Sequence, residues 1–202
     1  MGFFVAHEHI SYNRTMRTVG IDEVGRGCWA GPVVAGAVLL HQPVEGLRDS
    51  KVLTAKKRVE LDVRIRANGE VGLGWVWPEE IHEIGLTEAV RLAMRRALAE
   101  ITTQYDEVII DGNSNYLPDV VGSRALIKAD DLVPAVSAAS IAAKVARDTY
   151  MQQIAAEYPA YGFEKHVGYG TAAHIAALEL HGVTPLHRLT YKPIIRIMEQ
   201  AA

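Results

Sequence analysis

Three short apolar stretches of this chain end in acidic residues, and this recurrence limits the folds open to it. Each stretch is rich in Val, Ile or small residues, as buried strands are. The acids that follow them are Asp22-Glu23, Asp111 and Asp130-Asp131. Carboxylates beside a buried strand are costly unless water or a cation reaches them. Neighbouring strands would gather these acids into one cluster, although turn preference alone explains any single one of them.

The wider pattern predicts one α/β domain in which a mixed sheet is packed by helices. The expected strands are Thr18–Asp22, Pro32–Leu40, Val71–Trp77, Val108–Ile110 and Ala125–Lys128. The expected helices are Thr54–Asn68, a helix capped by Thr87 that runs to Ile101, Ser137–Tyr158 and Thr171–His181. The first of these also alternates like a strand, but its Lys, Arg and Glu content favours a helix. Residues 1–17 are predicted to be a poorly ordered leader, and residues 18–202 to be the domain.

The composition of the chain limits where the protein can be located and which partners it can bind. Of the 202 residues, 49% are hydrophobic and 22% are charged, which is typical of a globular domain. The longest apolar run, Pro32–Leu40, is too short to span a bilayer, and the lone Cys28 permits no internal disulfide. We therefore expect a cytoplasmic protein. The net charge of −3 does not favour nucleic acid, but metal-binding carboxylates raise the acid count, and binding needs only a local basic face.

The acidic residues themselves indicate metal chemistry. Oxygen ligands suit Mg²⁺ or Mn²⁺ better than zinc. Two such ions about 4 Å apart would clamp the attacking and leaving oxygens of a phosphodiester displacement. Adjacent strand residues point to opposite faces, so Asp22 and Glu23 can share a site only if the chain bends or one offers its main-chain oxygen. Gly25 makes such a bend feasible.

The glycine-rich turn after the first strand is a second candidate feature. Residues 25–30 match the dinucleotide pattern G-x-G-x-x-[GA], but that pattern requires a helix next, and Pro32–Val34 continues as strand. We interpret Gly25 and Gly27 as allowing backbone amides to approach a ligand, with Arg26 available to a phosphate. A plain tight turn is the alternative interpretation.

Other conspicuous residues are predicted to be structural. Cys28 is expected to be a small packed residue, and Trp75 and Trp77 are expected to belong to the core. The eight histidines show no metal-ligand spacing. Ser140 and Lys144 miss the S-x-x-K pattern by one residue, so the sequence gives no support for acyl transfer.

Taken in order, the motifs resemble those of the ribonuclease HII family from about residue 18 to residue 193. The matching blocks are G-I-D-E-V-G-R-G at 20–27 with A-G-P-V at 30–33, D-S-K-V-L-T at 49–54, D-G-N at 111–113, K-A-D at 128–130 with S-A-A-S-I-A-A-K-V at 137–145 and R-D at 147–148, G-Y-G-T at 168–171, and H-R at 187–188. The chain departs from the family pattern at Cys28-Trp29, and Thr190-Tyr191 replaces the usual Ser-Phe.

This resemblance implies a ribonuclease-H-like fold with a helical C-terminal part. It implies an endonuclease that cuts RNA in RNA/DNA hybrids and cuts 5′ of single ribonucleotides in duplex DNA, leaving 3′-hydroxyl and 5′-phosphate ends. The implied catalytic and metal-binding residues are Asp22, Glu23, Asp111 and Asp130, the last preferred to Asp131 by its place in K-A-D. The implied substrate-binding residues are Gly25, Arg26 and Gly27 at the 2′-hydroxyl, Tyr169 on the next sugar, and Lys51 on a phosphate.

Partners and competing functions follow from the same comparison. The expected partners are RNA/DNA hybrids and ribonucleotide-containing duplex DNA, with no membrane and no obligate protein partner, and the protein is expected to be a monomer. The 17-residue leader is shorter than the extra N-terminal domain of type 3 enzymes, which favours type 2. The alternative is a hybrid-binding module that has lost catalysis, although all four acids are present. A small-molecule phosphatase is a third possibility, but the D-x-D-x-[TV] motif is missing.

Overall fold

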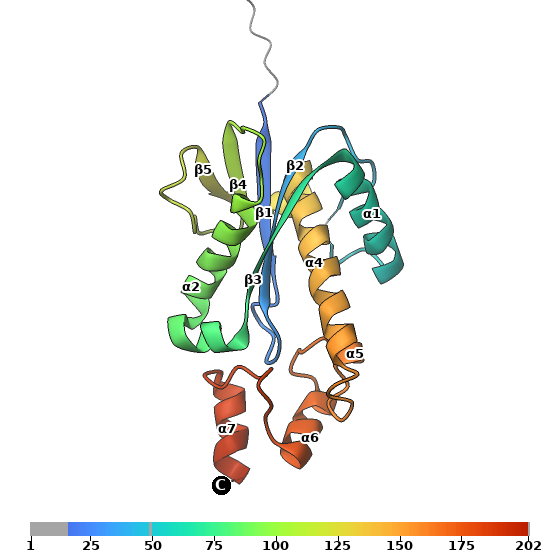
Figure 1. The fold of residues 1–202 in the computed structure, drawn as a ribbon, viewed down its shortest axis with the longest axis vertical. Coiled ribbons are helices and arrows are strands. Elements are labelled where there is room, and N and C mark those ends of the chain that lie inside the picture. The colour runs from blue at the N-terminus through green and yellow to red at the C-terminus, as the bar shows by residue number, and fades with distance from the viewer. Residues whose placement is uncertain (1–15, 49, 202) are drawn as a thin grey trace, which may run out of the picture.

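The computed structural model describes residues 16–48 and 50–201, so that most of the predicted leader and Asp49 lie outside the described residues. Its centre is a five-stranded sheet with the strand order β3-β2-β1-β4-β5 (Figure 1). An antiparallel half contains β1 (Thr18–Val24), β2 (Val33–Leu40) and β3 (Gly69–Val76). A parallel half adds β4 (Glu107–Asp111) and β5 (Ser123–Leu126) beside β1.

Strand register places the acids at one edge of the sheet. Because β1, β4 and β5 are parallel, their carboxyl ends lie at the same edge. Ile21 pairs with Ile110, so the residues that follow them, Asp22 and Asp111, lie at the same level on adjacent strands. Asp111 in turn pairs with Leu126, which leads into the segment that carries Asp130.

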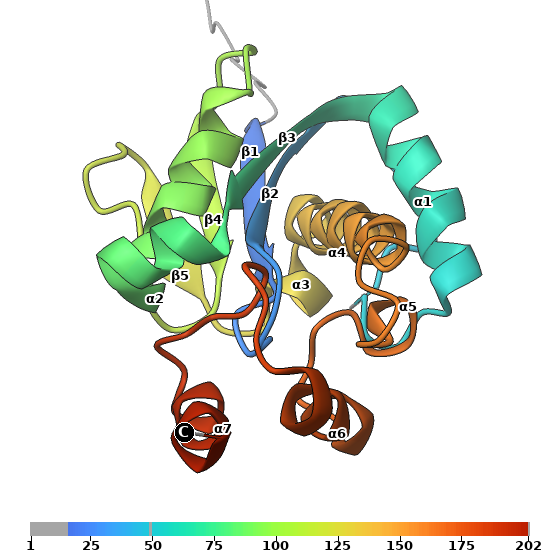
Figure 2. The same ribbon diagram turned by 60° about the horizontal axis from the view of Figure 1, so that its bottom comes forward.

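Two long helices cover opposite faces of the sheet, α4 (Pro134–Ile154) on one and α2 (Pro78–Ala99) on the other (Figure 2). Glycines in the strands permit this close packing. A Cβ at Gly36 would lie 2.5 Å from the Ala139 carbonyl oxygen, and one at Gly74 would lie 1.8 Å from that of Ala93. The small residues of the strands and the Ala-rich helix therefore fit each other, and α1 (Ala55–Asn68) packs on the outside of α4.

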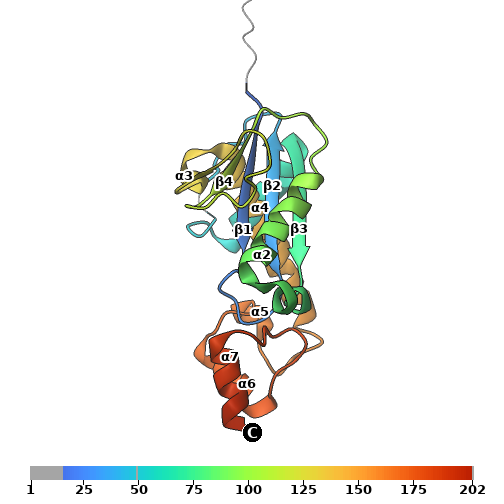
Figure 3. The ribbon, with the colours of Figure 1, turned by 90° about the vertical axis from the view of Figure 1, so that its left-hand side faces the viewer.

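The C-terminal part is helical and lies beyond one end of the sheet (Figure 3). It contains α5 (Phe163–His166), α6 (Ala172–His181) and α7 (Lys192–Ala201). Its connecting segments pair with the β1–β2 loop: the Trp29 amide donates to the Gly168 carbonyl at 2.8 Å, and the Arg188 amide donates to the Trp29 carbonyl at 2.8 Å. The C-terminal part is therefore packed directly against the glycine-rich turn.

The predicted mixed sheet with flanking helices is confirmed, and several element boundaries change. The helix predicted from Thr87 begins at Pro78 and bends at Gly85, where φ is 78°. The last predicted strand ends at Leu126, because Lys128 adopts a left-handed conformation (φ 58°) and begins the short helix α3 (Ala129–Leu132). Helix α4 covers residues 134–154 rather than 137–158. Helices α5 and α7 were not predicted.

Side-chain packing corrects one further expectation. Trp75 and Trp77 are half-buried rather than core residues; they stack on each other with ring centroids 5.7 Å apart, and both meet Tyr150 edge-on. Cys28 is fully buried, as expected of a small packed residue. Among the described residues, no helix is both long enough and apolar enough to cross a bilayer.

Candidate active site

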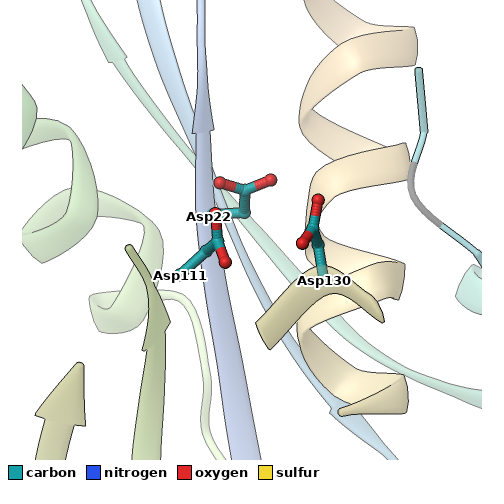
Figure 4. A group of neighbouring side chains, drawn as sticks. All are labelled: Asp22, Asp111 and Asp130. Atoms are coloured by element: carbon teal, nitrogen blue, oxygen red, sulfur yellow. The ribbon is translucent and has the colours of Figure 1, made fainter. Parts of the chain in front are cut away.

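Three aspartates from three different elements converge at the carboxyl edge of the parallel strands. Asp22 on β1, Asp111 at the end of β4 and Asp130 in α3 each place one carboxylate oxygen within 4.8 Å of the others. Their side chains point toward a common point (Figure 4). Asp130 is buried, whereas the neighbouring Asp131 is exposed, because a helical turn directs consecutive residues to different sides.

Local hydrogen bonds fix the orientation of this cluster. Asp111 Oδ1 accepts the Ala129 amide at 2.8 Å, which ties the end of β4 to the first turn of α3. Asp22 Oδ1 accepts the Glu23 amide at 2.8 Å. Each of the three side chains offers one carboxylate oxygen to the group, so a ligand could meet all three side chains.

Burial and mutual repulsion disfavour the ionised form of two acids at this site. Burial, and then repulsion from Glu23 and Asp111, raises the pKa of Asp22 to about 8, although a hydrogen bond with Ser140 opposes the shift. Burial also raises the pKa of Glu23, against the attraction of Arg26. Carboxyl groups with raised pKa values in a concave site are typical of metal or catalytic centres.

Glu23 lies beside the three aspartates rather than within their tight group. Its carboxylate is 3.6 Å from Arg26 Nη1, and its side chain remains 16% exposed. Asp22 and Glu23 nevertheless line the same depression, since the strand ends here and turns at Gly25. The structure therefore brings both adjacent acids to one site.

One depression of about 340 Å³ contains most of the residues singled out in the sequence. It is lined by the predicted Asp22, Glu23, Gly25, Arg26, Gly27, Lys51, Asp111 and Tyr169. Asp130 adjoins it through Lys51, whose Nζ lies 4.0 Å from Asp130 Oδ2. Three cations, Arg26, Lys51 and Lys144, line the same depression, which makes a local basic rim on a chain of net charge −3.

Ser50, Ser140 and Lys144 are lining residues that the sequence analysis did not assign to the site. Ser140 and Lys144 are four residues apart on α4, and this spacing places them on one face of the helix. The Ser140 hydroxyl is 2.9 Å from that of Ser50, and Lys144 Nζ is 5.7 Å from the centre of the Tyr169 ring. Helical periodicity was the available signal, but only the packing of α4 shows that this face points into the site.

The two glycines of the turn have different environments. Gly25 has φ 87°, and a Cβ there would lie 2.3 Å from Arg147 Nε and 2.7 Å from the Pro32 carbonyl oxygen. Gly27 is exposed, and a Cβ there would meet no protein atom within 4 Å. Gly25 is therefore required by the fold itself, whereas the fold would tolerate a side chain at Gly27.

Two fully buried arginines donate hydrogen bonds to the backbone of the β1–β2 loop, which contains this turn. Arg147 donates to the carbonyl oxygens of three residues, Ala30, Pro32 and Val167, at 2.9–3.0 Å. Arg188 donates to the Gly31 carbonyl from both Nε and Nη2, at 3.0 and 2.8 Å. Arg147 in particular links the β1–β2 loop to the segment that leads into Tyr169.

Three buried histidines lie beneath the Tyr169 segment. The Thr184 amide donates to His187 Nδ1 (2.9 Å), so the His187 proton lies on Nε2, which faces His174 Nε2 at 3.0 Å. The His174 proton then lies on Nδ1, which donates to the Tyr169 carbonyl at 2.9 Å. His166 stacks on His174 with ring centroids 4.5 Å apart. Burial lowers the pKa of both His174 and His187 to about 4.

The sequence did not predict this group of histidines. Its members, His166, His174 and His187, are too far apart in the chain to form a recognisable motif. Their ring nitrogens bond to one another and to the backbone, which is a structural arrangement. Within the described part of the chain, the group of potential metal-binding side chains is the Asp22–Asp111–Asp130 cluster.

Comparisons with known proteins agree on one family. The family model described as Ribonuclease HII matches residues 19–194. The chain is 46% identical over 185 residues to ribonuclease HII of Shewanella loihica, covering 89% of each protein. It is 47% identical over 184 residues to ribonuclease HII of an Acidovorax species, covering 89% of this chain and 87% of the relative.

Solved structures show the same fold. The crystal structure of ribonuclease H2 from Pyrococcus horikoshii superposes with a TM-score of 0.78 at 26% identity, covering 92% of this chain and 98% of that one. The Bst-RNase HIII structure in complex with Mn²⁺ gives a TM-score of 0.72 at 20% identity, covering 92% and 70%. The expected ribonuclease-H-like fold is thereby confirmed.

Proposed function

The chain belongs to the ribonuclease HII family, and we propose that it cuts RNA paired with DNA, including the bond 5′ of a single ribonucleotide embedded in duplex DNA. One observation carries this proposal: Asp22 and Asp111 of the carboxylate cluster line the same depression as the glycine-rich turn. A site for phosphodiester hydrolysis and a backbone surface suited to sugar recognition are thus adjacent.

The donor set fits a divalent cation with a preference for oxygen ligands, and Mg²⁺ or Mn²⁺ is the proposed ion. The clustered oxygens of Asp22, Asp111 and Asp130 lie close enough to bind a shared ion, with Glu23 at the margin. A positive ion would also offset the burial and the repulsion from Glu23 and Asp111 that raise the pKa of Asp22. When bound, such ions supply Lewis-acid stabilisation of the phosphodiester oxygens.

The protein's own residues select and orient the substrate. The backbone of the turn at Gly25, Arg26 and Gly27, which is exposed at the last two residues, is proposed to contact the 2′-hydroxyl, which distinguishes RNA from DNA. The Tyr169 ring, 41% exposed at the rim, is proposed to pack on the sugar of the next nucleotide. Lys51 is proposed to contact a phosphate. Hydrolysis would leave 3′-hydroxyl and 5′-phosphate ends.

The direct test is cleavage of a labelled DNA duplex with one ribonucleotide, with Mg²⁺ and with chelator. We expect a single cut 5′ of the ribonucleotide only with Mg²⁺, in any base context, and no cut in an all-DNA duplex. Binding without cutting would instead identify a hybrid-binding module. Equal cutting of the all-DNA duplex would exclude recognition of the 2′-hydroxyl.

Gly27→Ala offers a variant that separates recognition from folding. Because the new methyl group would meet no protein atom within 4 Å, the melting temperature should change little. The methyl group should hinder close approach of the ribose and lower cleavage at least about 10-fold, since one lost contact of about 1.4 kcal/mol has that effect. The matched change Gly25→Ala should destabilise the fold, because φ there is 87° and the Cβ position is occupied.

A further inference from the structure

The carbonyl oxygen of Arg26, in the middle of the glycine-rich turn, accepts hydrogen bonds from two residues of the C-terminal part. The Tyr191 hydroxyl donates to it at 2.8 Å, and Arg188 Nη1 donates to it at 3.1 Å. Arg188 Nη1 also donates to the Tyr191 hydroxyl at 2.8 Å, which closes a triangle of hydrogen bonds. The guanidinium of Arg188 is fully buried and 5.3 Å from the Tyr191 ring centre, so the donors are themselves held in place.

The geometry of a peptide group transmits this constraint to the site. In a trans peptide the C=O of one residue and the N–H of the next point in opposite directions. The Arg26 carbonyl faces Arg188 and Tyr191, so the Gly27 N–H points away from them. Gly27 lines the depression next to the carboxylates, and within the described chain no acceptor takes its N–H. The amide is therefore directed to the side where a ligand would bind.

We infer that Tyr191 is a positioning residue for ribose selection, whose hydroxyl fixes the Arg26–Gly27 peptide so that the Gly27 N–H meets the 2′-oxygen of the substrate. This inference rests on the proposed function. Tyr191 is not among the residues that line the depression, so it is assigned an indirect role. It acts by limiting the rotation of one peptide group, and preorganisation of this kind improves binding without a new contact.

A single hydroxyl deletion tests this role. In the cleavage assay with Mg²⁺, KM is measured for the single-ribonucleotide duplex, and KI is measured for the all-DNA duplex as a competitor. The ratio of KI to KM reports preference for ribose. In Tyr191→Phe we expect this ratio to fall about 3- to 10-fold, the range for one weakened hydrogen bond, through a raised KM. The KI of the all-DNA duplex should stay unchanged.

Tyr161→Phe is the matched control. The Tyr161 hydroxyl also donates to a backbone carbonyl of the C-terminal part, that of Gly182 at 2.9 Å, but this carbonyl is not in the glycine-rich turn. Its loss should lower the melting temperature and leave the ratio of KI to KM at the wild-type value. An equal fall of the ratio in both variants would show general loosening and overturn the inference, as would an unchanged ratio in Tyr191→Phe.

A double-mutant cycle tests whether Tyr191 acts through Gly27. If it does, Tyr191→Phe should change the ratio little once Gly27→Ala has removed productive use of that amide. Independent effects of the two changes would refute this route. Failure of the proposed function is distinguishable, because the wild-type protein would then show no ribose preference at all.

Discussion

Two neighbouring groups of buried ionisable side chains differ in how the protein satisfies them. In the first, Asp22 and its neighbours at the strand ends repel one another, and the pKa of Asp22 is raised to about 8. In the second, Arg147 and Arg188 are fully buried, yet their hydrogen bonds go to backbone carbonyls and to the Tyr191 hydroxyl. The histidines beneath Tyr169 are likewise bonded in a chain.

This difference distinguishes the carboxylates, which form the candidate active site, from the arginines and histidines, which stabilise the backbone around it. A buried group with its bonds satisfied within the protein lowers the energy of one conformation and needs nothing further. Neighbouring buried carboxylates repel one another and raise the energy of the free protein, and a bound cation lowers that energy again. The carboxylates therefore form the part of the site that a bound cation would stabilise. The arginines and histidines hold the glycine-rich turn and the Tyr169 segment in one conformation.

The largest expected effect is on catalysis. Asp111→Asn should reduce the cleavage rate by at least about 10³-fold, because charge stabilisation at a metal site is of that order. The asparagine carbonyl can still accept the Ala129 amide, so the fold should persist. Single-turnover rates on the single-ribonucleotide duplex, with circular dichroism as the folding control, provide the measurement. Near-normal activity would show that the cluster is not the catalytic centre.

The supporting group should show its largest effect on stability. Arg147→Met leaves three carbonyl oxygens without their donor, and each unsatisfied buried group costs about 1–3 kcal/mol, so unfolding should become at least about 3 kcal/mol easier. Urea denaturation measures this change.

The control for that variant is Arg95→Met. Arg95 pairs with Asp119 at the surface, where its side chain is 44% exposed, so the change should cost less than about 1 kcal/mol. Equal losses for Arg147 and Arg95 would contradict the structural role assigned to the buried guanidinium.

An intermediate effect is expected from metal binding to the free protein. Mg²⁺ at about 100 times its Kd should stabilise the fold by about 2.7 kcal/mol, or roughly 5–10 °C in melting temperature. Asp22→Asn should melt higher than wild type in chelator, because it removes a carboxyl group whose ionisation is opposed by burial and by Glu23, and it should gain less from Mg²⁺. If it melts lower in chelator by several degrees, Asp22 stabilises the fold rather than straining it.

The smallest effect concerns acid stability. His174 and His187 have a pKa of about 4 in the folded protein and about 6.5 when unfolded, so between these values the unfolded chain binds more protons. Their contribution to stability is therefore complete above about pH 6.5 and is lost as the pH falls toward 4.

His174→Phe should reduce the slope of unfolding free energy against pH in this window by up to about 1.4 kcal/mol per pH unit, the value for one proton. Urea titrations at several pH values measure the slope. The exposed His82→Gln serves as control and should leave the slope nearly unchanged. A wild-type slope in His174→Phe would show that the pair does not resist protonation.

Much of this molecule could be predicted from local sequence. Continuous apolar runs bounded by glycines indicate buried strands, and Gly182 indicates where a helix ends, so β1, β2 and α6 fall close to their predicted ranges. The family motifs likewise point to the acids and to the glycine-rich turn, since each motif is contiguous in the chain. Boundaries set by backbone dihedrals, such as the left-handed Lys128 that starts α3, were missed.

What local sequence cannot specify is the meeting of distant residues. Asp22 and Asp111 share a site because Ile21 pairs with Ile110 across parallel strands, a register chosen by burial of both strands together. Ser140 joins them because glycines let α4 approach the sheet, and Tyr191 reaches Arg26 across the chain because the C-terminal part packs on the β1–β2 loop. Short-range periodicity determined the elements and their acids, whereas the packing energy of the whole domain decided which side chains became neighbours.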